Sequence, residues 1–147
     1  GIDAARWRAL VAAAAALCRD LGVEALLNGD PALAREYGLG LHLRAGQLQA
    51  FDPASRPRGP ALAASCHAAA DLQRASALGC DFVVLGAVRP TPSHAGVAGM
   101  GWDGFAALRE DCDLPIYAIG GLGRDDVATA RAHGAQGIAA IRGLWAG

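Results

Sequence analysis

Short apolar segments alternate with longer amphipathic ones along the chain, and this alternation predicts its secondary structure. Six apolar runs have the length of buried strands, at residues 23–27, 40–43, 61–65, 81–85, 115–119 and 137–141. Helices are expected at 4–20, 31–37, 67–78, 102–110 and 124–133, several of them followed by glycine. The stretch from 44 to 60, whose part from 52 to 60 is rich in Pro and Arg, is expected to be irregular. Strands that alternate with helices in this way predict a parallel α/β architecture.

A (β/α) barrel is favoured over an open doubly wound sheet, which also alternates. The helices are short, and polar or glycine residues follow the strands, where barrel enzymes place their chemistry. A complete barrel needs about 200 residues or more, and the chain has 147. We therefore expect one domain, residues 1–147, with a TIM-type barrel that lacks its first two strands. A separate segment or subunit is expected to complete the barrel wall.

Composition excludes several classes of function. Hydrophobic residues make up 53% and charged residues 18%, which favours a folded core, and no apolar run reaches the length of about 18 residues that crosses a membrane. The net charge is -1 without a basic block, so a nucleic-acid partner is not expected. All 13 basic residues are arginine, which excludes Schiff-base chemistry by lysine.

The four cysteines lack the spacing of a metal site, and so no metal ligand is assigned. Cys18 and Cys80 lie within apolar patterns and are expected in the core, whereas Cys66 and Cys112 have no predicted role. Thiols scattered in this way indicate a cytoplasmic protein.

Two glycine-containing segments predict a phosphate site. Gly120 and Gly121 stand between a strand and a helix, and Ile141 and Arg142 stand at the end of the next strand. Glycine lets the backbone approach a ligand, and N–H groups at the start of a helix attract an anion. Gly120-Gly121 alone is equally consistent with a tight turn. The second segment at the neighbouring strand end favours phosphate.

The long segment from 86 to 101 follows a strand, and its length and hydroxyl content are typical of a lid or ligand clamp. Thr91, Ser93 and His94 are expected to donate hydrogen bonds to a diphosphate; the alternative is a mobile surface loop. Asn28 and Ser65, at two other strand ends, are predicted to contact the substrate, although Asn28 also suits a helix cap.

The other histidines are assigned no chemistry. His42 is expected to line the barrel or core with a satisfied ring, His67 to begin a helix and His133 to end one.

The segments LLN, GLHL, ASCH, GAVRPTPSH, AIGG and GIAAI, in this order, resemble the thiamine phosphate synthase and thiazole tautomerase superfamily. They are most similar to the domain that follows a Nudix hydrolase in some bacterial proteins. The resemblance implies a barrel enzyme that joins a pyrimidine diphosphate to a thiazole phosphate, with magnesium and basic residues holding the pyrophosphate. It places Asn28 in the pyrimidine pocket. It also implies diphosphate contacts from Ser65, Thr91 and Ser93, and thiazole phosphate contacts from Gly121, Ile141 and Arg142.

The sequence departs from the family at the charged positions. The family has Asp after the asparagine, where this chain has Gly29; its second magnesium-binding Asp has no counterpart in 44–48; and its loop lysine is His94. The tautomerase's catalytic histidine corresponds to Ala87. Three hypotheses remain: a divergent transferase with slow pyrophosphate release, a tautomerase-like enzyme with His94 as the catalytic residue, and a non-catalytic phosphate-binding module attached to a Nudix hydrolase.

Overall fold

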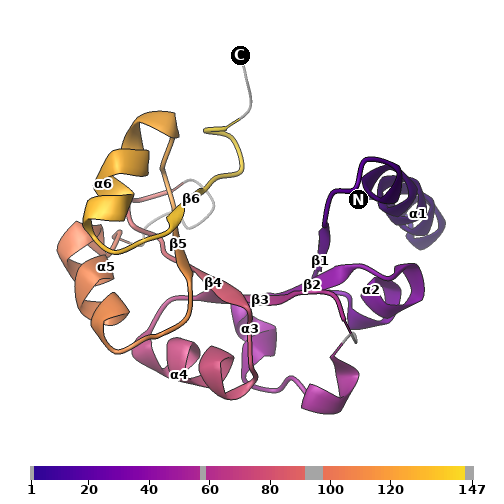
Figure 1. Cartoon of the computed structure of the whole chain (residues 1–147), viewed down its shortest axis with the longest axis horizontal. Helices are drawn as coiled ribbons and strands as arrows, with labels where there is room; N and C mark the ends of the chain where they lie inside the picture. Colours follow the sequence, from indigo (N-terminus) through magenta and orange to yellow (C-terminus); the bar gives the residue numbers. More distant parts are fainter. Residues whose placement is uncertain (1, 57–58, 92–97, 145–147) are drawn as a thin grey trace.

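The computed structural model describes residues 2–56, 59–91 and 98–144, and within them six parallel strands form one sheet. The strands are β1 (Leu26–Asn28), β2 (Gly40–Leu43), β3 (Leu62–Cys66), β4 (Phe82–Leu85), β5 (Ile116–Ile119) and β6 (Gly137–Ala139). Each strand pairs with the next in chain order, which leaves β1 and β6 at the two edges. Figure 1 shows the sheet curving into an arc that does not close. The predicted α/β fold with an open barrel wall is therefore confirmed.

Helices cover the convex side of this arc (Figure 1). They are α1 (Ala4–Asp20), α2 (Pro31–Tyr37), α3 (Ala45–Leu48), α4 (Ala69–Ala77), α5 (Gly101–Glu110) and α6 (Val127–Ala132), with 3-10 turns at Pro53–Ser55 and Arg124–Asp126. None of the helices in the described part of the chain is long and apolar enough to cross a membrane.

The first two helices begin and end where the sequence predicts. The Asp3 carboxylate accepts the Arg6 N–H at 2.8 Å, and the Asp30 carboxylate accepts the Leu33 N–H at 3.0 Å. Each carboxylate satisfies a backbone donor that has no partner within the helix. Gly38 ends α2 with φ +67°, a left-handed conformation that glycine adopts without strain.

Three sequence expectations were wrong in detail. Residues 44–60 are not wholly irregular, because α3 forms within them, followed by the turn at Pro53–Ser55, where the Asp52 carboxylate accepts the Ala54 N–H at 2.9 Å. The first strand begins at Leu26 and not at Val23, whose side chain is 57% exposed. Cys18 is only partly buried, whereas Cys80 lies in the core as expected.

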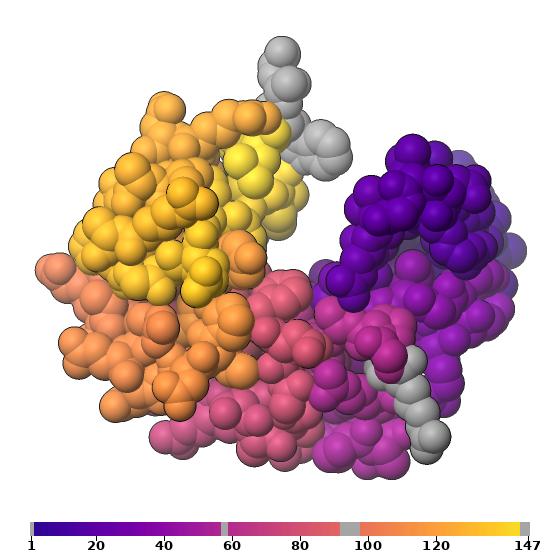
Figure 2. Space-filling view, viewed as in Figure 1, coloured from indigo at the N-terminus to yellow at the C-terminus, as the bar shows by residue number. Residues whose placement is uncertain are grey.

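The two faces of the sheet differ in burial. Alternate residues on the convex face pack under the helices and are fully buried, including Leu41, Leu43 and Leu85. On the concave face His42, Ser65 and Ile119 are only half-buried. Residues aligned across parallel strands point to the same face, as Asn28 and His42 do. Side chains on the concave face therefore face the hollow that Figure 2 shows between the N-terminal and C-terminal parts.

Candidate functional site

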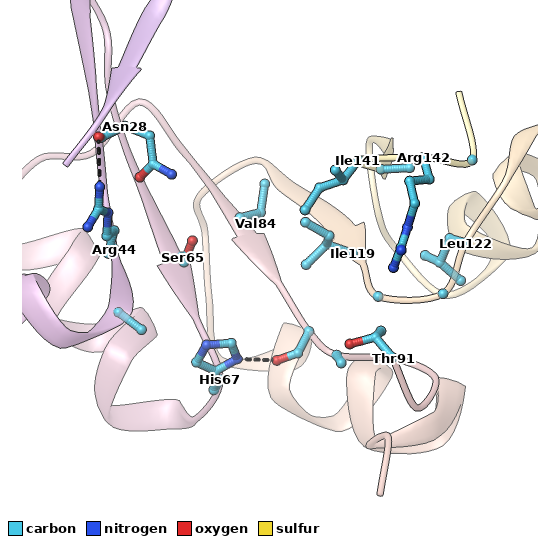
Figure 3. Close-up of a pocket in the computed structure, with 17 residues that line it drawn as sticks. Asn28, Arg44, Ser65, His67, Val84, Thr91, Ile119, Leu122, Ile141 and Arg142 are labelled. Atoms are coloured by element: carbon cyan, nitrogen blue, oxygen red, sulfur yellow. Dashed lines mark hydrogen bonds between the residues drawn. The ribbon is translucent and has the colours of Figure 1, made fainter. Parts of the chain in front are cut away.

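A cavity of about 380 Å³ opens at the carboxyl ends of the strands. Figure 3 shows its lining, which comes from the residues that follow β1 to β6 and from the concave face. The lining residues are Asn28, Arg44, Ala45, Ser65, His67, Val84, Gly86, Ala87, Thr91, Ile119, Gly120, Gly121, Leu122, Ala140, Ile141, Arg142 and Gly143. Its volume is at the lower end of the range for small-molecule sites, about 300–1,000 Å³, so it suits one small ligand.

Unused backbone donors gather at the β5–β6 side of the cavity. Among the described residues, the N–H groups of Gly121, Leu122, Ile141 and Arg142 donate no hydrogen bond. Because β6 ends at Ala139, Ile141 and Arg142 lie beyond the sheet ladder. Backbone donors without partners bind anions readily, since the amide dipoles favour negative charge. The structure thus brings together the two segments that were predicted to bind phosphate.

Two glycines allow this part of the wall to pack closely. Gly120 has φ +109°, and a Cβ there would lie 2.7 Å from both Cα and Cβ of Ala87. Gly121 has φ +66°, and a Cβ there would lie 3.0 Å from Cβ of Arg89. Both positions combine a conformation that favours glycine with a lack of space for a side chain. The two glycines therefore allow the loop after β5 to pack against the loop after β4.

An ion pair behind the cavity fixes the same loop. The Arg89 guanidinium contacts both carboxylate oxygens of Asp126, at 2.6 and 3.1 Å, and donates to the carbonyl of Gly121 at 3.4 Å. The Gly123 N–H donates to Asp126 at 2.9 Å. This N–H, together with Arg89, lowers the pKa of Asp126, so the carboxylate stays charged. Arg89 and Asp126 do not line the cavity. They affect the predicted phosphate site indirectly, because they fix the position of the loop after β5.

Polar side chains line the opposite side, at the ends of β1, β2 and β3. Asn28 and Ser65, which are predicted to contact the substrate, point into the cavity (Figure 3). His42 on β2 shares a hydrogen bond with the Ser65 hydroxyl, with 2.8 Å between Nε2 and Oγ. Burial lowers the pKa of His42, so its ring is neutral at pH 7 and orients the hydroxyl without adding charge. The prediction of a satisfied, barrel-lining His42 is confirmed.

His67 lines the cavity as well, which the sequence interpretation missed. It precedes α4, and its backbone N–H donates to the Asp71 carboxylate at 2.9 Å. Its Nδ1 contacts the carbonyl oxygen of Gly86 after β4, and a carbonyl can only accept, so Nδ1 carries the proton. This contact orients the ring over the floor of the cavity.

The segment after β4 contributes Thr91, whose hydroxyl oxygen is buried at the cavity wall and has no hydrogen-bond partner among the described residues. A buried hydroxyl left in this way costs about 1–3 kcal/mol. A ligand oxygen that accepted from it would remove that cost. Ser93 and His94, the other two polar residues predicted in this segment, lie outside the described residues.

The sequence interpretation also missed Arg44. A signal for it exists in the strand period, because Arg44 stands two residues after His42, as His67 does after Ser65, and so shares the concave face. Arg44 and His67 both follow predicted strands, Arg44 in a stretch expected to be irregular and His67 at an expected helix start, and polar side chains at such places are usually exposed to solvent.

The buried thiols are not candidates for covalent chemistry. Burial raises the pKa of Cys66 to about 12 and that of Cys80 to about 11. A thiol attacks as its thiolate, which is then scarce at pH 7. Cys66 also lies on the convex face, away from the cavity.

Magnesium, which the family resemblance implies, does not fit the residues present. Magnesium prefers carboxylate oxygens, and no Asp or Glu lines the cavity within the described part of the chain. The described residues also contain no group of three His, Cys, Asp or Glu that would hold a metal. Asp30 and Asp71, the carboxylates closest in sequence to the polar side, cap helices instead.

Comparisons with known proteins show which family the chain resembles. A family model described as thiamine monophosphate synthase matches residues 1–144. A thiamine-phosphate synthase from Acidithiobacillus ferrooxidans is 33% identical over 147 residues, which is 98% of this chain and 68% of that protein. One from Thioalkalivibrio sulfidiphilus is 34% identical over 134 residues, or 89% of this chain and 64% of that protein.

A solved structure shares the fold. The thiamine phosphate pyrophosphorylase from Pyrococcus furiosus superposes with a TM-score of 0.73 at 18% identity, covering 96% of this chain and 68% of that one. The chain therefore spans about two thirds of the length of the proteins it resembles.

Proposed function

Since the chain belongs to the thiamine monophosphate synthase family, we propose that its cavity binds a phosphorylated thiazole or pyrimidine of thiamine synthesis. The observation that carries this proposal is the group of unused amide donors after β5 and β6. Gly121 and Leu122 supply two of them and Ile141 and Arg142 the others. The Arg142 side chain adds a positive charge at the same wall (Figure 3).

The heterocycle lies, in this proposal, between the phosphate and the polar side of the cavity. Val84 and Ile119 form an apolar floor for a flat ring, and Asn28 and Ser65 offer hydrogen bonds to ring nitrogens or an amine. Thr91 donates its buried hydroxyl to the ligand. A thiazole phosphate bound in this way has its phosphate after β5 and β6 and its ring toward β3.

Calorimetric titration tests the proposal with three compounds: thiazole phosphate, the corresponding thiazole alcohol and inorganic phosphate. We expect thiazole phosphate to bind more tightly than either of the others, because it uses the amides and the apolar floor together. Equal affinity for the phosphate ester and the alcohol would contradict a phosphate site. Equal affinity for the ester and inorganic phosphate would contradict a ring site.

A transferase reaction is the first activity to measure, because the relatives are named thiamine-phosphate synthases. It would join the thiazole phosphate nitrogen to the pyrimidine methylene carbon, with pyrophosphate leaving from that carbon. Binding without turnover is the second candidate, and the absence of carboxylate and lysine from the described cavity lining favours it. In that role the domain would hold its ligand for an attached hydrolase of the Nudix type.

Pyrophosphate release from the two precursors separates these candidates. Release that depends on both precursors supports the transferase. Binding of thiazole phosphate without release supports the binding module. A tautomerase-like reaction through His94 predicts instead that His94→Ala abolishes proton exchange on a thiazole substrate and leaves its affinity unchanged.

A further inference from the structure

The Arg44 guanidinium lies against the backbone of Gly29. A Cβ built at position 29 would lie 2.5 Å from Nε of Arg44 and 2.8 Å from its Cζ. Distances below about 3 Å are closer than van der Waals contact between these atoms allows. A side chain at position 29 and the observed position of Arg44 therefore exclude each other. The missing side chain at Gly29 makes room for the guanidinium.

Hydrogen bonds between two loops hold Arg44 at this place. Its Nη2 donates to the carbonyl of Asn28 at 3.4 Å, and its backbone N–H donates to Oε1 of Gln47 at 3.2 Å. The Gln47 amide nitrogen in turn donates to the carbonyl of Gly29 at 3.0 Å. Figure 3 shows the contact between Arg44 and Asn28 at the edge of the cavity. The loops after β1 and β2 thus position the guanidinium before any ligand binds.

No described carboxylate neutralises this charge. The ion pairs of the described residues do not include Arg44 or Arg142, which are also the two arginines that line the cavity. A guanidinium stays charged at every physiological pH and offers five N–H donors, of which the contact with Asn28 uses one. The cavity therefore carries two positive charges, one toward each end.

We infer that Arg44 is a built-in cation at the end of the cavity formed by the loops after β1 and β2, so that a diphosphate binds at that end without a divalent metal. The inference rests on the proposed function, in that the ligand carries phosphate. Guanidinium groups bind phosphate oxygens in pairs of parallel hydrogen bonds. A divalent cation at the same end would be repelled by Arg44 and would find no carboxylate among the described lining residues.

Calorimetric titration with inorganic pyrophosphate tests this inference in two buffers, one with EDTA and one with magnesium. We expect binding in EDTA that is at least as tight as in magnesium, since magnesium sequesters the free anion. Arg44→Ala should weaken binding in EDTA by roughly tenfold to a hundredfold, the effect of one charge-assisted hydrogen bond. Arg19→Ala is the control, because Arg19 lies on α1 and does not line the cavity.

Gly29→Ala provides a second variant, which moves Arg44 without removing its charge. We expect it to weaken pyrophosphate binding in the same direction as Arg44→Ala. Gly22→Ala is its matched control, since Gly22 has φ +64° against +76° for Gly29 and a Cβ there meets nothing within 4 Å. Circular dichroism and melting curves establish that each variant is folded.

The outcomes separate the inference from the proposed function. Pyrophosphate binding that requires magnesium, or equal affinities of Arg44→Ala and Arg19→Ala, overturns the inference and leaves a phosphate site possible. Failure of pyrophosphate to bind in either buffer also overturns the inference, whereas the proposed function stands or falls with the titration of thiazole phosphate. Binding in EDTA that is lost in Arg44→Ala and kept in Arg19→Ala supports the built-in cation.

Discussion

Replacing Gly121 with alanine tests the phosphate side of the cavity with a single methyl group. The methyl would stand at φ +66°, 3.0 Å from Cβ of Arg89 and 3.3 Å from the carbonyl oxygen of Pro90. The loop after β5 has to shift to relieve these contacts. That shift moves the N–H groups of Gly121 and Leu122, which are the donors assigned to the phosphate.

Two costs are expected, and they are measured separately. An alanine in a left-handed conformation costs about 1–2 kcal/mol, which lowers the melting temperature of a chain of this size by about 2–8 °C. Each N–H bond to phosphate that is lost costs about 1.5–3 kcal/mol of binding, or roughly tenfold to a hundredfold in affinity. The affinity therefore falls beyond what the loss of stability explains.

Gly38→Ala is the matched control for this variant. Gly38 has φ +67°, a Cβ there meets nothing within 4 Å, and the residue caps α2 away from the cavity. Melting curves should fall for both variants, whereas calorimetry with inorganic phosphate should show weaker binding for Gly121→Ala alone. Unchanged affinity in Gly121→Ala, or equal losses in the two variants, would refute the assignment of the phosphate to these amides.

Three further predictions concern residues outside the phosphate contacts. Arg89→Ala should weaken phosphate binding severalfold although Arg89 does not line the cavity, because the ion pair with Asp126 fixes the loop after β5. Unchanged phosphate affinity by calorimetry would show that this loop keeps its position without the ion pair. Burial lowers the pKa of His42 below its usual 6.5, so as the pH falls the unfolded chain binds a proton at this residue before the folded chain does. The free energy of unfolding should therefore fall as the pH drops below about 6.5. Urea unfolding of His42→Gln should lack that part of the pH dependence, and an identical profile would contradict it. The unpaired edges of β1 and β6, with Val23 just before β1 57% exposed, predict concentration-dependent self-association in light scattering; a monomer at all concentrations would argue against it.

The fold followed from local patterns that act over a few residues. Each strand is a short apolar run, and Asp30 with Pro31 and Gly38 set the ends of α2 by capping and backbone conformation alone. The helix at Ala45–Leu48 escaped prediction because its start depends on Gln47, whose side chain is held by the carbonyl of Gly29, 18 residues away. Contacts across that distance leave no periodic signal in the sequence.

The part of the site formed by backbone amides could be predicted from the sequence. The part formed by side chains was harder to predict. Glycines at strand ends pointed to Gly121, because a close approach to backbone requires that residue type. For Arg44 the strand period gives only the face on which it lies, and an arginine after a strand is usually an exposed side chain in solvent. Its role depends on the empty space beside Gly29, and only the packed structure shows that space.

Amide chemical shifts on addition of thiazole phosphate test the central claim most directly. In a nitrogen–proton correlation spectrum, the cross-peaks of Gly121, Leu122, Ile141 and Arg142 should move together as the ligand is titrated, because their N–H groups change from unused donors to phosphate donors. The thiazole alcohol should leave these four peaks in place. Shifts of equal size with the alcohol, or shifts confined to residues of the convex face, would contradict a phosphate site at the ends of β5 and β6.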